Sequence, residues 1–165
     1  MSIRSLNENG AARASFTRPA NTTQYTAGDT MSDSTNVMTF HHTLFEFRGT
    51  IKQAILVDSA NQTTLLDAEL WLFDTAPAVT TDNAVIAFTD AELSQLVGIV
   101  NFAVANGKIG LATAGAGGNA VNVQTSLDIP VRGKGTNDIY GVLVARNAYT
   151  PVSAEIFTVI LSVMY

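Results

Sequence analysis

The sequence predicts an all-β protein: a single-domain antiparallel β-sandwich, jelly-roll-like, with one short helix and an extended N-terminal arm. Two observations lead to this fold class. About eight short β-rich runs are separated by turn residues every 8 to 12 positions, and only one segment has a helical signature. The long loops are unevenly placed along the chain, which favours a jelly roll over an immunoglobulin-like fold.

The N-terminal part is predicted to be an arm. Residues 1–15 are polar and small and follow neither a strand nor a helix period, so we expect them to be disordered in isolation. The next stretch, FTRPANTTQYTAGDTMSD, holds a short Thr-rich strand at 23–26 between Pro19 and the turn at Gly28. We therefore divide the chain into an extended arm, residues 1–35, and a β-sandwich domain, residues 36–165.

The body of the chain is predicted to consist of strands. In residues 64–73, leucines and alanines alternate with Asp67, Glu69 and Trp71, which is the period of a half-buried strand. The last run, EIFTVILSVMY, is apolar on one face and mostly apolar on the other, which predicts a central strand whose second face is covered by a neighbour. The β-rich runs are 42–59, 64–73, 98–105, 108–112, 120–129, 138–146 and 155–165.

One segment, TDAELSQLVG at 89–98, is predicted to be a helix of one or two turns. Thr89 or Asp90 is the expected N-cap, Glu92 lies in the first turn, and Gly98 ends the segment. The stretch at 107–120 is rich in Gly and Ala and is typical of a flexible hairpin tip.

Composition excludes several classes of function. The 165 residues are 47% hydrophobic and only 14% charged, against about 25% charged in an average domain. Cysteine is absent, which excludes disulfides, thiol catalysis and cysteine-ligated metals. No apolar run is long enough to span a membrane, and no signal peptide is visible, so we expect synthesis in the cytoplasm.

Charge is distributed unevenly along the chain. The net charge is −5, while the first 20 residues carry three arginines and one glutamate, a net +2. Residues 21–165 therefore carry a net charge of −7 and contain no basic cluster. This charge argues against nucleic-acid binding by the folded part.

The candidate catalytic and metal-binding residues do not form a recognisable site. Asp74, Asp82 and Asp90, with Asn83, lack the spacing of an EF-hand loop, and we interpret them as turn and cap residues. His41 and His42 are adjacent on an expected strand and so point to opposite faces. No hydrolase, zinc-protease or nucleotide motif occurs, and we expect no catalytic residue, cofactor or metal.

Two strings resemble virion structural proteins of tailed bacteriophages: SFTRPANTTQYTAGDTMSDS at 15–34 and LWLFDTAPAVTTDNAVIAFTDAELSQLVGIVNF at 70–102. Together they cover about a third of the chain. The resemblance implies a capsid cement, or decoration, protein on the outer capsid surface of the virion, which binds the lattice of the major capsid protein at capsomer junctions. It supplies no catalytic residues.

The predicted fold suits this role. A weakly charged β-sandwich offers surface that can be buried in a contact, and an N-terminal arm can become ordered when the protein binds the capsid. The expected partners are the major capsid protein and further copies of this chain in a homotrimer, with neither nucleic acid nor membrane. The expected capsid contacts are Arg4, Arg13, Phe16, Arg18 and Tyr25, and the expected trimer contacts are Ile156, Ile160 and Met164.

Two alternatives remain open at this point. One is a tail-associated or receptor-binding module that contacts host glycans through exposed loops. The other is a small carbohydrate-active enzyme, which would need two carboxylates facing one cleft. The candidates for such a pair are Asp74, Asp82, Glu46 and Glu69.

Overall fold

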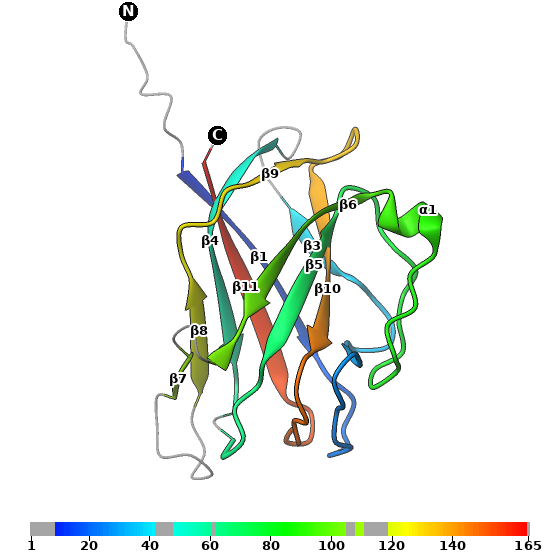
Figure 1. The fold of residues 1–165 in the computed structure, drawn as a ribbon, viewed down its shortest axis with the longest axis vertical. Coiled ribbons are helices and arrows are strands. Elements are labelled where there is room, and N and C mark those ends of the chain that lie inside the picture. The colour runs from blue at the N-terminus through cyan, green and yellow to red at the C-terminus, as the bar shows by residue number, and fades with distance from the viewer. Residues whose placement is uncertain (1–8, 42–47, 61, 105–107, 111–118, 165) are drawn as a thin grey trace, which may run out of the picture.

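The computed structural model describes residues 9–41, 48–60, 62–104, 108–110 and 119–164, which form a sandwich of two antiparallel sheets (Figure 1). The larger sheet has the strand order β1-β11-β4-β8-β7, and β9 pairs with the first part of β4. Its strands are β1 (Asn9–Thr17), β4 (Arg48–Asp58), β7 (Lys108–Gly110), β8 (Ala120–Gln124), β9 (Ile129–Arg132) and β11 (Ile156–Met164).

The smaller sheet has the order β2-β10-β5-β6, with β3 also paired to β10. Its strands are β2 (Thr30–Met31), β3 (Met38–His41), β5 (Ala68–Phe73), β6 (Leu96–Phe102) and β10 (Asp138–Ala145). One helix, α1 (Asp90–Leu93), lies between β5 and β6 in the sequence.

The pairing of the strands follows a jelly roll. The first strand pairs with the last (β1 with β11), and the next ones pair inward along the chain: β2 and β3 with β10, β4 with β8, and β5 with β6. The pairs alternate between the two sheets, as in a long antiparallel ribbon wrapped around a core. The predicted all-β sandwich is therefore confirmed.

The main core lies between the sheets and follows from the alternation of side chains along each strand. On β11, Phe157, Val159, Leu161 and Val163 are buried, while the residues between them face outward. They belong to the same cluster as buried residues of the smaller sheet, such as Leu70, Phe102 and Leu143.

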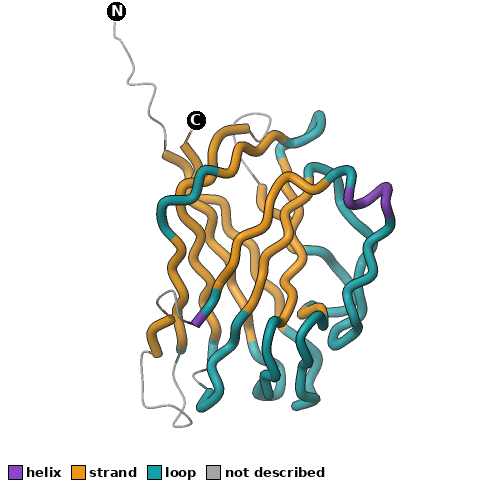
Figure 2. The backbone as a smooth tube through the Cα atoms, in the orientation of Figure 1, coloured by secondary structure: helices purple, strands orange, loops and turns teal. Residues whose placement is uncertain are grey.

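A second cluster covers the outer face of the smaller sheet. The loop of residues 74–89, which we call the flap, brings Ile86 and Phe88 against Phe73, Val142 and Val144. The ring centroids of Phe73 and Phe88 are 4.9 Å apart in an edge-on arrangement. The flap runs beside the sheets as a long non-helical, non-strand segment that leads into α1 (Figure 2). The smaller sheet is therefore covered on both faces at β10 and the end of β5, whereas Ile99 and Asn101 of β6 are exposed.

The N-terminal part differs from the predicted arm. Residues 9–17 form β1, which pairs with β11 in a continuous antiparallel register from Asn9 opposite Met164 to Thr17 opposite Ile156. Ala12, Ala14 and Phe16 point into the core. The boundary at residue 35 thus does not separate an arm from the sandwich, and the strand expected at 23–26 is reduced to one bridge, between Tyr25 and Tyr149.

The predicted helix is shorter than the segment that suggested it. Thr89 is the N-cap, and its hydroxyl and the Glu92 carboxylate form a reciprocal capping box. The helix ends after one turn, because Leu96 and the residues that follow pair with β5 as strand β6. Most of the predicted hairpin tip at 107–120 lies outside the described residues, as does His42.

Candidate interaction surface

The outer face of the larger sheet is an exposed, weakly charged surface. On four adjacent strands, every second residue is buried in the core between the sheets. The residues between them therefore point outward. We call these residues the outer face: 11, 13, 15 and 17 on β1; 156, 158, 160, 162 and 164 on β11; 53, 55 and 57 on β4; and 121 and 123 on β8.

The centre of the outer face is made of aliphatic and β-branched side chains in register. Ile160 of β11 lies between Arg13 of β1 and Ile55 of β4, and Ile55 lies beside Val123 of β8. The next row along the strands contains Thr158, Val57 and Val121. Such cross-strand rows form a continuous apolar surface.

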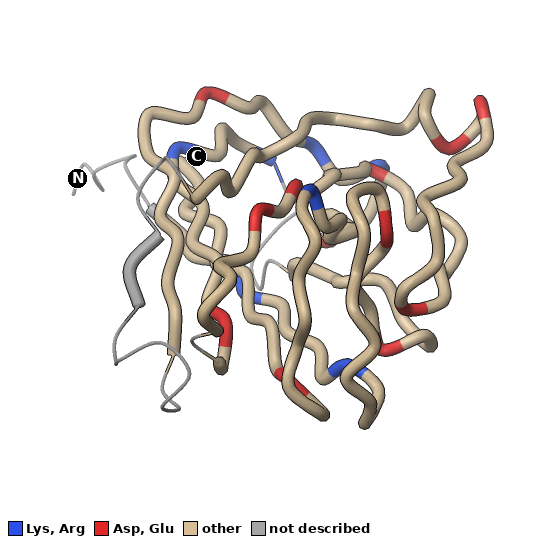
Figure 3. Tube along the Cα trace, turned by 60° about the horizontal axis from the view of Figure 1, so that its bottom comes forward, with Lys and Arg blue, Asp and Glu red and all other residues tan. Residues whose placement is uncertain are grey.

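Arg13 is the one charged residue among the fourteen positions of the outer face. Lys52 lies next to this surface at the bulge where β4 shifts register against β11, and its ammonium group is 2.6 Å from the Asp128 carboxylate. Charged residues are scattered singly along the trace, with long uncharged stretches between them (Figure 3).

The expected trimer contacts lie on this surface. Ile156 and Met164, at the two ends of β11, are each 43% exposed, and Ile160 is partly buried in the middle. Of the expected capsid contacts, Arg13 is exposed on the outer face. Arg4 lies outside the described residues.

The other expected capsid contacts are buried and cannot reach a partner in the folded protein. Phe16 packs in the core against Phe157, with ring centroids 5.6 Å apart. Arg18 is only 1% exposed and Tyr25 is fully buried. The prediction that these three residues contact the capsid is therefore wrong. The side chains of Arg18 and Tyr25 belong to an internal polar cluster that fixes the segment following β1.

That cluster joins residues 18–32 to the flap. Arg18 donates from Nε to the Tyr25 hydroxyl (2.9 Å) and from Nη2 to Asp82 Oδ2 (3.2 Å). Tyr25 donates to Asp82 Oδ1 (2.5 Å), which also accepts from the Ser32 amide (3.1 Å). Burial, and then the hydrogen bond to Asp82, raise the pKa of Tyr25, so the phenol stays protonated.

The three aspartates of the flap region have different roles. Asp82 is half of a buried ion pair and, with Asn83, forms a turn, so it is more than the loop residue that we predicted. Asp74 accepts from the Thr75 hydroxyl, and Asp90 is the first residue of α1. In the described part of the chain, no group of three or more His, Asp or Glu side chains could hold a metal ion.

The carboxylates suggested for a carbohydrate-active enzyme have separate partners. Asp82 pairs with Arg18, whereas Glu69 binds Arg146 and accepts from Trp71 Nε1 (3.0 Å). Glu46 lies outside the described residues. His41 contacts Asp138, with 2.7 Å between Nδ1 and Oδ1, at an exposed position.

A buried pair of carboxyl groups exists elsewhere, and sequence reasoning missed it. Tyr149 donates to Asp58 Oδ2 (3.0 Å) and lies 2.5 Å from Glu155 Oε1, and both carboxylic residues are only 1% exposed. Burial, followed by the hydrogen bond with Asp58 and its charge, raises the pKa of Glu155 to about 8. Because both carboxyl groups are buried, we assign the pair to the core.

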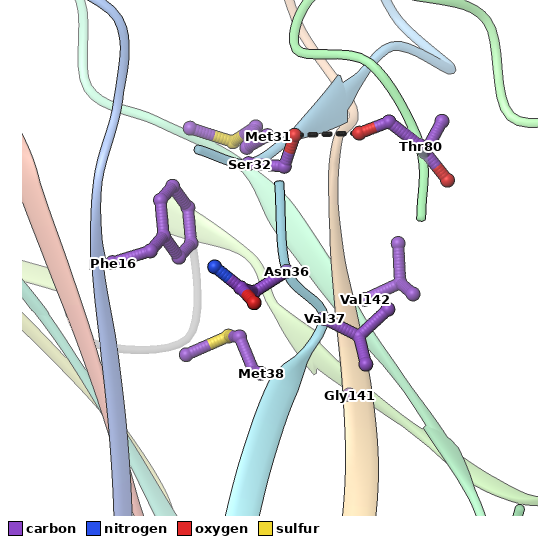
Figure 4. Close-up of a pocket in the computed structure, with 9 residues that line it drawn as sticks. All are labelled: Phe16, Met31, Ser32, Asn36, Val37, Met38, Thr80, Gly141 and Val142. Atoms are coloured by element: carbon purple, nitrogen blue, oxygen red, sulfur yellow. Dashed lines mark hydrogen bonds between the residues drawn. The ribbon is translucent and has the colours of Figure 1, made fainter. Parts of the chain in front are cut away.

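Of the cavities that described residues line, one is narrow and another is open to solvent. Phe16, Met31 and Met38 point into a narrow space of about 10 Å³, room for about one water molecule, where β1 meets β2 and β3 (Figure 4). Ser32 donates to the Thr80 carbonyl (2.7 Å) at its rim. A second depression of about 220 Å³ lies beside α1, open to solvent and lined by Pro77, Glu92 and Lys134 among others.

These observations define a jelly-roll β-sandwich whose most distinctive exposed feature is a weakly charged sheet face. No helix in the described residues is both long and apolar enough to cross a membrane. Comparison with protein-family models and with curated proteins finds no match to this chain.

Proposed function

We propose that this protein is a structural component of a tailed-phage virion: a cement protein that binds the outside of the capsid, joins neighbouring major capsid protein subunits, and has no catalytic activity. The observation that carries the proposal is the outer face of the larger sheet, with its apolar centre and its single charge. A cement protein that acts as a trimer needs exposed area to bury between its copies, and exposed apolar surface of this kind is typical of interaction sites.

The resemblance to virion proteins supports the same role and has a structural counterpart. The strings 15–34 and 70–102 contact each other through Arg18, Tyr25 and Asp82. The similar strings therefore contribute to one structural unit, in which residues 18–32 hold the flap against the smaller sheet.

The proposed capsid contacts must change because Phe16, Arg18 and Tyr25 are internal. The surface available for the lattice includes the exposed apolar residues of the flap, Val79 and Val85. Val85 is 69% exposed, the highest value among the exposed large hydrophobic residues. We propose that the flap meets the capsid and that copies of the protein meet each other elsewhere, in the trimer expected from the sequence.

The proposal is tested by electron cryomicroscopy of intact particles, with the computed fold placed into the density. Hundreds of copies at capsomer junctions, with the flap toward the capsid, are expected for a cement protein. A few copies at the tail would contradict the proposal and favour the receptor-binding alternative. Absence from purified particles would exclude both virion roles.

A further inference from the structure

We infer that the outer face of the larger sheet is covered in solution by the same face of neighbouring copies of this chain. The inference concerns self-association and does not depend on binding to a capsid.

The two sheets differ in how their outer faces are covered. The smaller sheet is covered by the flap, which builds a second apolar cluster around Phe73, Val142 and Val144. In the part of the chain that the structure describes, no corresponding cluster lies on the larger sheet, although Ile55, Val57 and Ile160 point outward from its centre. A sheet with apolar residues on both faces is typical of strands that are buried on both sides.

The chemistry of the outer face favours a copy of itself as the occupant. Its centre offers aliphatic side chains and the hydroxyl of Thr158, and its one charge, Arg13, lies on the edge strand β1. Two such faces can therefore pack with no charge trapped at the centre of the contact. A strongly acidic partner would find only one complementary charge there, and a strongly basic partner would find none.

The size of the outer face is sufficient for association. Eight residue steps along β11, from Ile156 to Met164, span roughly 27 Å, and four strands side by side occupy roughly 19 Å. Because β8 and the part of β4 that pairs with it extend over only about half of that length, the footprint is roughly 400 Å² per copy; two facing copies bury roughly 800 Å², and three copies around an axis roughly 1,200 Å², the lower limit for a specific interface.

Three copies can also bury this surface around a common axis. If the larger sheets of three copies form the sides of a triangular prism, each side is as wide as four strands, roughly 19 Å. The middle of each sheet then lies roughly 5.5 Å from the three-fold axis. This distance is close to half the roughly 10 Å spacing of two packed sheets. Side chains from three sheets would fill such a prism without a channel. The geometry is therefore compatible with the trimer expected from the sequence.

The experiment measures the mass of the purified full-length protein by analytical ultracentrifugation from about 1 to 100 μM. A monomer of 17.5 kDa at all concentrations would overturn the inference. Two or three times that mass is expected, and Ile160→Lys should shift the protein to the monomer over the whole range. In the monomer, the lysine ammonium can extend from its partly buried position into water.

Two further variants separate loss of the interface from loss of folding. Thr158→Lys introduces the same charge in the same face at a position that is already polar, and should also give a monomer with an unchanged circular dichroism spectrum. Val85→Lys places the charge on the exposed flap and should leave the assembly intact. An oligomer that survives both Ile160→Lys and Thr158→Lys would overturn the assignment of this surface.

Discussion

The buried carboxyl pair of Asp58 and Glu155 makes the stability of the protein depend on pH, and Glu155→Gln tests this dependence. Glu155 hydrogen-bonds Asp58 and Tyr149 in the core, and its second oxygen accepts from the Val152 amide (2.8 Å). A glutamine keeps the size of the side chain, but its NH2 group replaces one of the two oxygens, so it loses the acceptor for either Tyr149 or the Val152 amide and should cost some stability equally at every pH. It cannot ionise.

The expected magnitude follows from the pKa of Glu155, which is about 8 in the folded protein against 4.5 ordinarily. Because the folded state holds this proton more tightly than the unfolded state, the stabilisation is full below pH 4.5 and is lost as the pH rises through 8. Each pKa unit corresponds to about 1.4 kcal/mol, so the loss between pH 5 and pH 9 is roughly 4 kcal/mol. That is a large part of a typical total stability of about 5 to 15 kcal/mol.

The assay is urea unfolding of the wild type and of Glu155→Gln at pH 5, 7 and 9. We expect the free energy of unfolding of the wild type to fall steeply over this range, and that of the variant to fall much less, whatever constant loss of stability the substitution causes. Asp128→Asn, the same kind of change at an exposed carboxylate, is the control and should follow the wild type. Parallel pH profiles for wild type and Glu155→Gln would refute the reasoning.

Three other substitutions test the packing described above. Asp82→Asn leaves the buried Arg18 without its counter-charge and should cost about 3 to 5 kcal/mol in urea unfolding; a loss below 1 kcal/mol would contradict the burial of this pair. Gly141→Ala places a methyl group 2.8 Å from the Phe40 ring and should lower stability by about 1 to 3 kcal/mol, seen as a reduced melting temperature. Thr89→Ala removes the cap of α1 and should cost about 1 kcal/mol, with faster amide hydrogen exchange at Glu92; unchanged exchange there would argue against the capping box.

Much of the fold could be predicted from the sequence because most strands carry strong patterns. The alternation in residues 64–73 and the apolar run at the C-terminal end correspond to β5 and β11. Strand β1 was missed because its inward residues include Ala12 and Ala14, which contribute little to a hydrophobic period. The alternation of Ala12, Ala14 and Phe16 with Arg13 and polar residues was the signal that could have revealed it.

The polar clusters could not be predicted, because their members come from distant parts of the chain. Arg18 and Asp82 are 64 residues apart, and Tyr149 and Asp58 are 91 apart. Neither separation follows a local period, so only the jelly-roll pairing brings the partners together. We expected Arg18 to be exposed, but it is buried because the fold brings Asp82 next to it.

The candidate surface was predicted in part. The second apolar face of β11 was visible in the sequence, including Ile156, Ile160 and Met164. Its neighbours on β4 and β8 could not be assigned to the same surface, since the order of the strands was unknown.

The position of β11 also constrains the order in which the protein can fold during synthesis. β11 lies between β1 and β4, yet the ribosome makes it after both of them. Until β11 emerges, β1 has no strand to pair with, and β4 lacks its partner on one side. Unpaired strand edges and late non-local pairing are typical of slow, aggregation-prone folding, so the edges of β1 and β4 stay open to pairing with other chains until β11 is in place.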